Sequence, residues 1–272
     1  MSTAGSSNDI SKSSDQTDTE QAQPRAGQRR VVAPLRLGIL RTDKVRASLS
    51  GRHGDYPAMF RHILQAVDDN LEIVDFDVQE AVPEYIDCDV YLITGSRHSV
   101  YDNLPWISPL VDFLQDVLRA RKKIIGICFG HQLMAHYFGG RVGKSDRGWG
   151  VGVLSSQVTR PAEWMTDADG RSPEPATPIQ LLYSHQDQVL ELPPQAQVFL
   201  SSAFCPIGGY TLGDQVIAVQ GHPEFSPAYA GDLMAQREAL IGAEVFAEGM
   251  ASLQLPVDAE RVVGWLLQFA RA

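Results

Sequence analysis

KKIIGICFGHQLMAHYFGG, residues 122–140, is the stretch of sequence that decides the fold. Its apolar run at 123–127 predicts a buried strand, and the residues from about 129 to 138 predict a helix. The join reads Gly-x-Cys-x-Gly around Cys128, a pattern typical of a sharp turn that lifts a nucleophile above the end of a sheet. Glycine suits positions 126 and 130 because larger side chains would crowd that strained turn.

Cys128, at the centre of this turn, is the candidate nucleophile. The helix that follows it directs the positive end of its dipole toward the sulfur, which favours the thiolate over the thiol. The alternative is that Cys128 is simply a small buried apolar residue. A base close to Cys128 would favour the catalytic interpretation.

The sequence GHPE at 221–224 offers that base. It follows an apolar strand expected over 215–220, so it also leaves the carboxyl end of a strand, where open α/β sheets place their sites. Because positions two apart in an extended segment point the same way, we expect His222 and Glu224 to face one site. His222 would then serve as general base and Glu224 would orient its imidazole. The alternative is that His222 only caps a turn.

Strands and helices alternate along the chain before this turn. The expected strands lie at 35–40, 71–78 and 89–94, and the expected helices at 56–69 and 106–120. Such alternation requires right-handed crossovers and a sheet that is covered on both faces. The prediction is an α/β fold with a doubly wound, mostly parallel sheet and helices on both faces.

The pattern changes after residue 139. Strand-like runs separated by turn residues predict a small added antiparallel sheet, and the runs lie at 150–159, 179–183, 197–201 and 215–220. We expect an exposed loop over 161–178 and helices over 227–241 and 257–270. Residues 1–33 are rich in Ser, Thr, Gln and Asp and predict a disordered tail, which leaves one domain over 34–272.

Composition excludes several classes of function. The formal net charge of −10 argues against a general electrostatic hold on nucleic acid or on an anionic membrane. No apolar run is long enough to span a bilayer and no secretory signal is present, so we expect a cytoplasmic protein. The three cysteines have no CxxC spacing, and no metal or other cofactor is expected. Cys88 and Cys205 do not lie in a Gly-x-Cys-x-Gly turn like that of Cys128, and we expect them to be inert packing residues.

Three motifs resemble the class I glutamine amidotransferases, which hydrolyse the side-chain amide of glutamine. They are GICFGHQ at 126–132, YSHQDQVLELP at 183–193 and QGHPEF at 220–225, and they occur in the order that the family has. The resemblance implies a flavodoxin-like core. It also implies a catalytic triad made of Cys128, His222 and Glu224.

Further roles follow from the same resemblance, position by position. Gly95 and Phe129 match the residues whose backbone N–H groups form the oxyanion hole, which typically contributes about 10²–10³ in rate per donor. The substrate-binding positions are Ser96, Gln132, Ser184, His185 and Gln186. Many relatives have glycine at the position of Gln186, so this chain departs from the family pattern there.

The sequence does not identify the molecule that accepts the released nitrogen. The chain contains no P-loop, no GxGxxG fingerprint and no SGGxDS-type loop that would indicate a synthetase site. We therefore expect a stand-alone enzyme that hydrolyses glutamine or a γ-glutamyl bond. The alternatives are an ammonia-supplying subunit for a separate synthetase chain, which the segment SVYDN at 99–103 favours by its likeness to GMP synthase, and a non-catalytic regulatory subunit.

One loop near the expected site has an unassigned role. Residues 41–56 follow the first strand and carry Arg46, Arg52 and His53. Loops above the carboxyl ends of strands often carry function, so these three side chains are candidates to pair with a carboxylate of the substrate.

Overall fold

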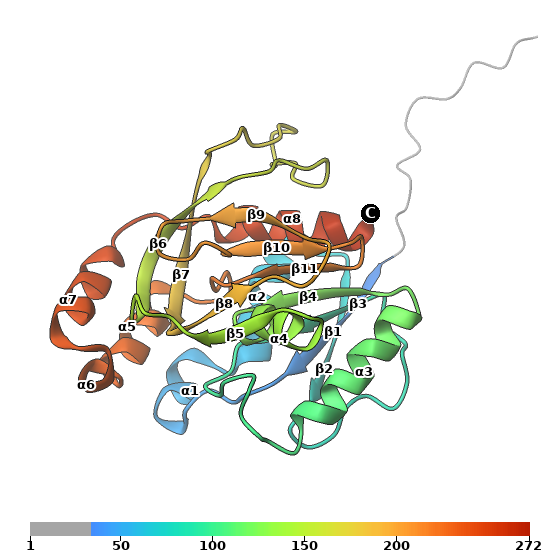
Figure 1. Cartoon of the computed structure of the whole chain (residues 1–272), viewed down its shortest axis with the longest axis horizontal. Coiled ribbons are helices and arrows are strands. Elements are labelled where there is room, and N and C mark those ends of the chain that lie inside the picture. Colours follow the sequence, from blue (N-terminus) through green and yellow to red (C-terminus); the bar gives the residue numbers. More distant parts are fainter. Residues whose placement is uncertain (1–33) are drawn as a thin grey trace, which may run out of the picture. The chain divides into compact units, whose positions relative to one another are not determined.

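Five parallel strands form the first part of a nine-stranded mixed sheet in the computed structural model, which describes residues 34–272 (Figure 1). In spatial order the parallel strands are β2 (Leu71–Asp77), β1 (Leu35–Arg41), β3 (Val90–Ile93), β4 (Lys123–Ile127) and β11 (Val216–Val219). This order is that of flavodoxin-like sheets. The tail expected over 1–33 lies outside the described residues.

The sheet continues with antiparallel strands beyond β11. They are β10 (Gly209–Leu212), β9 (Ala196–Ser201), β6 (Gly150–Val158) and β7 (Pro178–His185). A separate two-stranded antiparallel sheet pairs β5 (Arg141–Lys144) with β8 (Asp187–Glu191). The fold class expected from the sequence is confirmed, and most of the antiparallel strands extend the main sheet. The run at 215–220, expected in the added antiparallel sheet, instead forms β11, which joins the main sheet because it pairs parallel with β4 and antiparallel with β10.

Helices cover both faces of the parallel strands. One face carries α2 (Tyr56–Val67) and α8 (Ala259–Arg271), and the other carries α3 (Ile107–Arg119) and α4 (Phe129–Tyr137). Each pair buries an apolar stripe against Val, Ile and Leu side chains of the strands, which are apolar on both faces because both are covered.

The remaining helices lie beside the antiparallel strands β6 and β7, or pack on a helix that does. They are α1 (Ala47–His53), α5 (Pro227–Ala235), α6 (Glu238–Ile241) and α7 (Ala243–Ser252) (Figure 1). The single helix expected over 227–241 is therefore wrong, since the chain breaks it at Gln236 and Arg237. This break matters for the site described below.

The loop expected to be exposed over 161–178 is only partly so. Met165 is fully buried, and Trp164 packs against the core. Asp167 accepts hydrogen bonds from Arg261 and Trp265 of α8 at 2.6–3.1 Å, so the loop is fastened to that helix.

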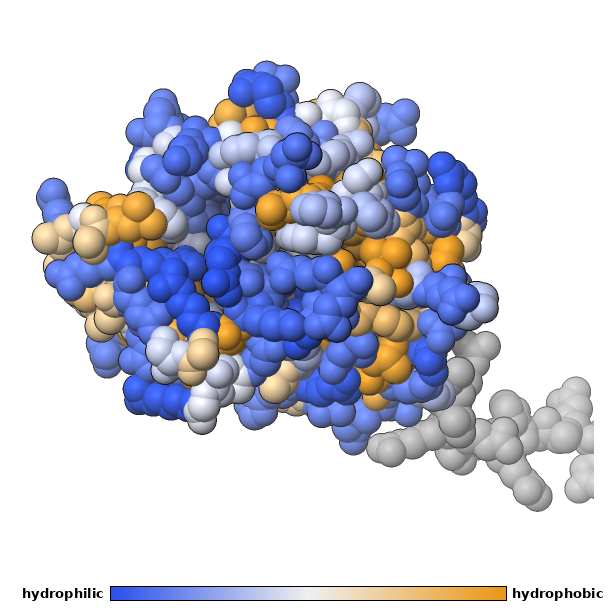
Figure 2. Space-filling view, turned by 90° about the horizontal axis from the view of Figure 1, so that it is seen from below, coloured by the Kyte–Doolittle hydropathy of each residue, from blue (hydrophilic) through white to orange (hydrophobic). Residues whose placement is uncertain are grey.

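The surface seen from below Figure 1 is largely hydrophilic, with hydrophobic residues gathered in separate smaller patches (Figure 2). Large apolar side chains that are exposed include Tyr85 and Leu240. Within residues 34–272, no helix combines the length and the apolar character that crossing a membrane would need.

Candidate active site

Cys128 occupies a strained turn between β4 and α4. Its backbone has φ 51° and ψ −94°, a positive φ that L residues rarely adopt. The turn is held because the Cys128 N–H donates to the Val219 carbonyl at 3.0 Å and its carbonyl accepts from Gln132 N–H at 3.0 Å. The side chain stands at the carboxyl edge of the sheet beside the first turn of α4.

The two glycines of the turn are required by close packing. A Cβ at Gly126 would lie 2.7 Å from the Gly130 backbone, and a Cβ at Gly130 would lie 2.7 Å from the Cβ and the carbonyl oxygen of Ile93. Real Cβ atoms do not approach so closely. The glycine requirement expected from the sequence therefore has a direct steric cause.

His222 and Glu224 lie next to Cys128 because β11 is the parallel neighbour of β4, with Val219 in register with Ile127. The His222 N–H donates to the Leu182 carbonyl at 2.8 Å, which fixes the segment after β11. His222 Nδ1 donates to Glu224 Oε1 at 2.8 Å, and the imidazole stacks on Phe225 with ring centroids 3.9 Å apart. The two side chains meet as their spacing predicts.

Charge around His222 keeps its imidazole protonated at neutral pH. Burial by itself lowers the pKa of His222, but the charges of Glu224 and Cys128 and hydrogen bonds to both outweigh burial and raise that pKa to about 10. Cys128, His222 and Glu224 are all buried. The arrangement can hold a thiolate beside an imidazolium, which is the pairing that cysteine nucleophiles use.

Gly95 lies against both of these groups. A Cβ on Gly95 would lie 2.8 Å from His222 Cε1 and 3.6 Å from Cys128 Cβ, so its backbone lines the space above the sulfur. The Gly95 N–H has no hydrogen-bond acceptor within residues 34–272. Phe129 is the first residue of α4, where helix geometry leaves the N–H without an acceptor. Two backbone donors are therefore available next to Cys128.

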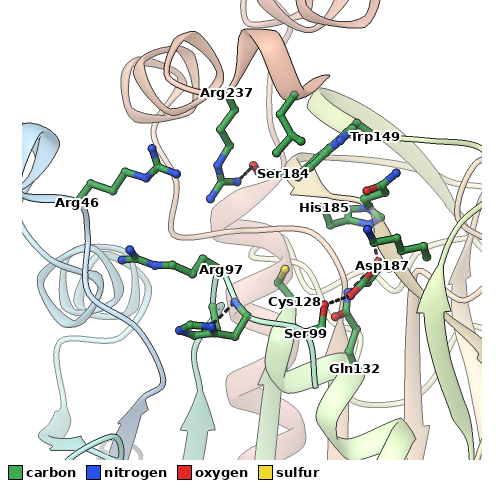
Figure 3. Close-up of a pocket in the computed structure, with 15 residues that line it drawn as sticks. Arg46, Arg97, Ser99, Cys128, Gln132, Trp149, Ser184, His185, Asp187 and Arg237 are labelled. Carbon is green, nitrogen blue, oxygen red and sulfur yellow. Dashed lines mark hydrogen bonds between the residues drawn. The ribbon is translucent and has the colours of Figure 1, made fainter. Parts of the chain in front are cut away.

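A cavity of about 370 Å³ opens at Cys128 (Figure 3). The five residues expected to bind substrate all line it, namely Ser96, Gln132, Ser184, His185 and Gln186. Gln132 Nε2 donates to the Asp187 carbonyl at 2.8 Å and to Gln220 Oε1 at 3.0 Å, which fixes its amide. Burial lowers the pKa of His185 to about 4, so this imidazole is neutral.

Several lining residues lie in no motif or candidate loop that would have predicted them for this site. They are Arg97, Lys144, Trp149, Arg237 and Leu240. Asp187, of the second sequence motif, also lines the cavity, and its Oδ2 accepts a 2.5 Å hydrogen bond from Ser99 Oγ. Arg237 reaches the cavity because the chain breaks between α5 and α6, and its Nη1 donates to Ser184 Oγ at 2.9 Å.

The loop at 41–56 contributes one side chain to the cavity. Arg46 lines it, as expected. Arg52 and His53 instead pair with Asp232 of α5, each at 2.7 Å, so the expectation that they meet a substrate carboxylate is wrong. Among the residues that the structure describes, no group of three or more His, Cys, Asp or Glu side chains has a metal-binding geometry.

Comparison with known proteins identifies a family. The model of "Glutamine amidotransferase class-I" matches residues 54–241. Gamma-glutamyl peptidase 3 from Arabidopsis thaliana is 34% identical over 138 residues, which cover 51% of this chain and 55% of that protein. A glutamine amidotransferase-like protein from Schizosaccharomyces pombe is 29% identical over 226 residues, which cover 78% of this chain and 87% of that protein.

Another relative is a larger enzyme, of which this chain matches only a part. GMP synthase from Aromatoleum aromaticum is 33% identical over 175 residues, which cover 61% of this chain and 31% of the synthase. The chain thus spans about half the length of the peptidase and about a third of the synthase.

Solved structures of low sequence identity share the fold. A glutamine amidotransferase from Thermotoga maritima superposes with a TM-score of 0.64 at 15% identity, over 87% of this chain and 96% of that chain. One from Methylobacillus flagellatus has a TM-score of 0.60 at 20% identity, over 87% and 95% of the two chains.

Proposed function

Because the chain belongs to the class I glutamine amidotransferase family, we propose that it hydrolyses the side-chain amide of glutamine or a γ-glutamyl bond. The observation that carries the proposal is the meeting of Cys128, His222 and Gly95 at the ends of the three neighbouring strands β4, β11 and β3. The proposal also takes residues 34–272 to be one domain that carries out this activity.

The first half of the reaction forms a thioester. The Cys128 sulfur attacks the γ-carbonyl carbon, and the carbonyl oxygen takes negative charge that the N–H groups of Gly95 and Phe129 stabilise. As the tetrahedral intermediate collapses, the bond from carbon to nitrogen breaks and His222 gives its proton to the departing nitrogen. Glu224 acts as a positioning residue, since it holds the imidazole through Nδ1.

The second half releases glutamate. His222, now neutral, removes a proton from a water molecule as that water attacks the thioester carbon. The bond between carbon and sulfur then breaks, and the products are the γ-carboxylate of glutamate and the free Cys128. In this proposal Ser96, Gln132, Ser184, His185 and Gln186 bind the substrate from the walls of the cavity.

Two groups of relatives favour two different fates for the nitrogen. The similarity to γ-glutamyl peptidases supports a self-sufficient hydrolase, and this is the reading that we prefer. The similarity to GMP synthases, of which the matched part is about a third, supports an ammonia-supplying subunit that needs a separate synthetase chain. Both share the thioester chemistry.

Glutamate release by the purified full-length chain tests the proposal. The substrates are glutamine and a panel of γ-glutamyl amino acids, and the matched control is Cys128→Ala. We expect release that falls by about 10³-fold or more in the variant, because no other group can form the thioester. The unfolding midpoint should stay close to that of the wild type, since the swap removes a single sulfur atom.

The other outcomes separate the alternatives. Release from glutamine alone, strengthened by a synthetase chain, would favour the ammonia-supplying subunit. Equal release by wild type and Cys128→Ala would overturn the mechanism. No release from any substrate, together with no reaction of Cys128 with a glutamine-like electrophile, would favour a regulatory subunit without turnover.

A further inference from the structure

One wall of the cavity carries positive charge that no carboxylate of the described residues neutralises. Arg237 donates to Ser184 Oγ and Arg46 donates to Gln236 Oε1 at 3.3 Å, and neither forms an ion pair within residues 34–272. Arg97 lies on the same wall, but its guanidinium is paired with Asp43 at 2.8 Å. Two arginines are therefore free to bind an anion, in a chain whose net charge is −10.

Arg237 is the more constrained of the two. Its side chain is partly buried, and burial together with the nearby charge of Arg46 lowers its pKa. Withdrawing a guanidinium from water without a counter-ion destabilises a protein. Such an arrangement is favourable when an anionic ligand completes it.

The position of Arg237 shows which part of a substrate it would meet. A small recess of about 20 Å³ is lined by Cys128, His222, Ser184 and Arg237, together with Tyr56 and Phe225. Gln132 and Asp187 line the large cavity but not this recess. In Figure 3, Arg237 lies on one side of Cys128, and Gln132, Ser99 and Asp187 lie on the other. Arg46 lines only the large cavity, and in the same view it lies on the Arg237 side of Cys128.

The chemistry of the proposed reaction assigns these two sides. His222 hands its proton to the departing nitrogen, so the leaving group lies on the His222 side of the sulfur. Arg237 shares its recess with His222 and therefore faces the leaving group. Gln132 and Asp187 face the glutamyl end.

Resting on the proposed function, we propose that Arg237, assisted by Arg46, binds a carboxylate on the leaving group. The favoured substrates are then γ-glutamyl amino acids or peptides with a free terminal carboxylate, because the ammonia that leaves glutamine carries no such group. Trp149 and the exposed Leu240 lie on the same cavity and offer apolar surface to the side chain of the leaving amino acid.

Two substrates that differ only in this carboxylate provide the test. They are γ-glutamyl-alanine and γ-glutamyl-alanine amide, and the readout is the ratio of their kcat/KM values in the full-length protein. We expect wild type to prefer the acid by about 10- to 100-fold, the usual range for a charged hydrogen bond. Arg237→Met should lower that ratio by a similar factor. Arg237→Lys should lower it less, because lysine keeps the positive charge but lacks the two parallel N–H donors of the guanidinium.

The matched control is Arg52→Gln. Arg52 also reaches α5, where it pairs with Asp232, but it does not line the cavity, so the ratio should stay at the wild-type value. A ratio of two substrates on one enzyme preparation does not depend on the folded fraction. Partial unfolding of a variant therefore does not imitate the expected result.

Two results would overturn the inference. One is a wild-type enzyme without preference for the acid, and the other is an unchanged ratio in Arg237→Met. If that unchanged ratio comes with equal losses on both substrates, Arg237 acts at the glutamyl end. Absence of cysteine-dependent release from glutamine and from both γ-glutamyl compounds would instead overturn the proposed function, and the inference with it.

Discussion

The backbone at Cys128 shows how single residues create the site. A positive φ at a residue that is not glycine is strained, and it persists only where the surroundings hold it. Here the hydrogen bond to Val219 and the close contact of Gly126 with Gly130 hold it. The strain directs the sulfur out of the sheet toward the cavity.

We predict that Gly130→Ala is strongly destabilising. Its Cβ would lie 2.7 Å from backbone and side-chain atoms of Ile93, which lies in a central strand and cannot move aside. The expected loss in free energy of unfolding is about 2–4 kcal/mol, measured by urea denaturation. Gly51→Ala is the matched control, because nothing lies within 4 Å of its Cβ and alanine favours helix α1 by about 0.5–1 kcal/mol. Equal stability of the two variants would contradict the steric argument.

The pH dependence of activity should report the charge on His222. Its pKa is raised to about 10, so the imidazolium persists from neutral pH until the pH approaches that value. We expect kcat/KM to fall on the alkaline side as His222 loses its proton. Glu224→Gln removes the charge that contributes most to the raised pKa, so the alkaline fall should move to lower pH. An alkaline limb at the same pH in both proteins would contradict this role of Glu224.

The raised pKa of His222 also makes the stability of the folded state depend on pH. The folded-state pKa of His222 lies above the unfolded value of about 6.5. The proton on His222 therefore stabilises the folded state fully below pH 6.5, and this contribution is lost as the pH rises toward 10. The urea midpoint of Glu224→Gln should show less loss than that of wild type over this window.

At the scale of elements, the sequence predicts those that follow a clear period. The parallel strands and α2, α3, α4 and α8 were predicted because each carries a continuous apolar run or stripe. The short elements α1, β5, β8, β10 and α7 were not, because they are held by pairing and packing with distant residues. The break before α6 contains no glycine or proline from which it could be predicted.

The site divides in the same way. Cys128, its two glycines, His222 and Glu224 lie in short motifs whose spacing alone predicts their geometry. The contact of Arg237 with Ser184 joins residues 53 apart, and that of Asp187 with Ser99 joins residues 88 apart. No local pattern encodes such contacts, so the place of Arg237 at the cavity could be found only in the folded chain.

A contact between a loop and a helix gives a prediction at this scale. Asp167→Ala removes the carboxylate that binds Arg261 and Trp265, leaving an unpaired guanidinium and an unsatisfied indole N–H on α8. We expect a loss of about 2–3 kcal/mol in the free energy of unfolding. Asp169→Ala, two residues away, should cost less than about 1 kcal/mol, because Asp169 and its partner Arg171 are exposed. Urea denaturation of both variants measures these changes. Similar losses in the free energy of unfolding would contradict the role of Asp167 in holding the loop against α8.

Across the whole described chain, three buried cysteines differ in their surroundings. Cys88 precedes β3 at its amino end, away from the cavity, and Cys205 lies in the connection between β9 and β10. Burial, followed by the charge of Asp87, raises the pKa of Cys88 to about 11, and burial raises that of Cys205 to about 12. Both therefore remain thiols near neutral pH, and neither lies next to an imidazolium. Cys128 alone among them lines the cavity and touches His222.

We predict that a diazoketone analogue of glutamine labels Cys128 and neither other cysteine. The thiolate is the reacting form of cysteine, and the glutamyl part of the reagent is held only in the cavity. Peptide mass mapping of the native protein at neutral pH should find one adduct, on the peptide that contains Cys128, and glutamine should slow its formation. The adduct should also raise the thermal midpoint, because its contacts with the cavity exist only in the folded state. Cys128→Ala should gain no adduct and no stability. Labelling spread over Cys88 and Cys205, or a rate that glutamine leaves unchanged, would show that exposure in a partly unfolded state, and not recognition at the sheet edge, governs the reaction.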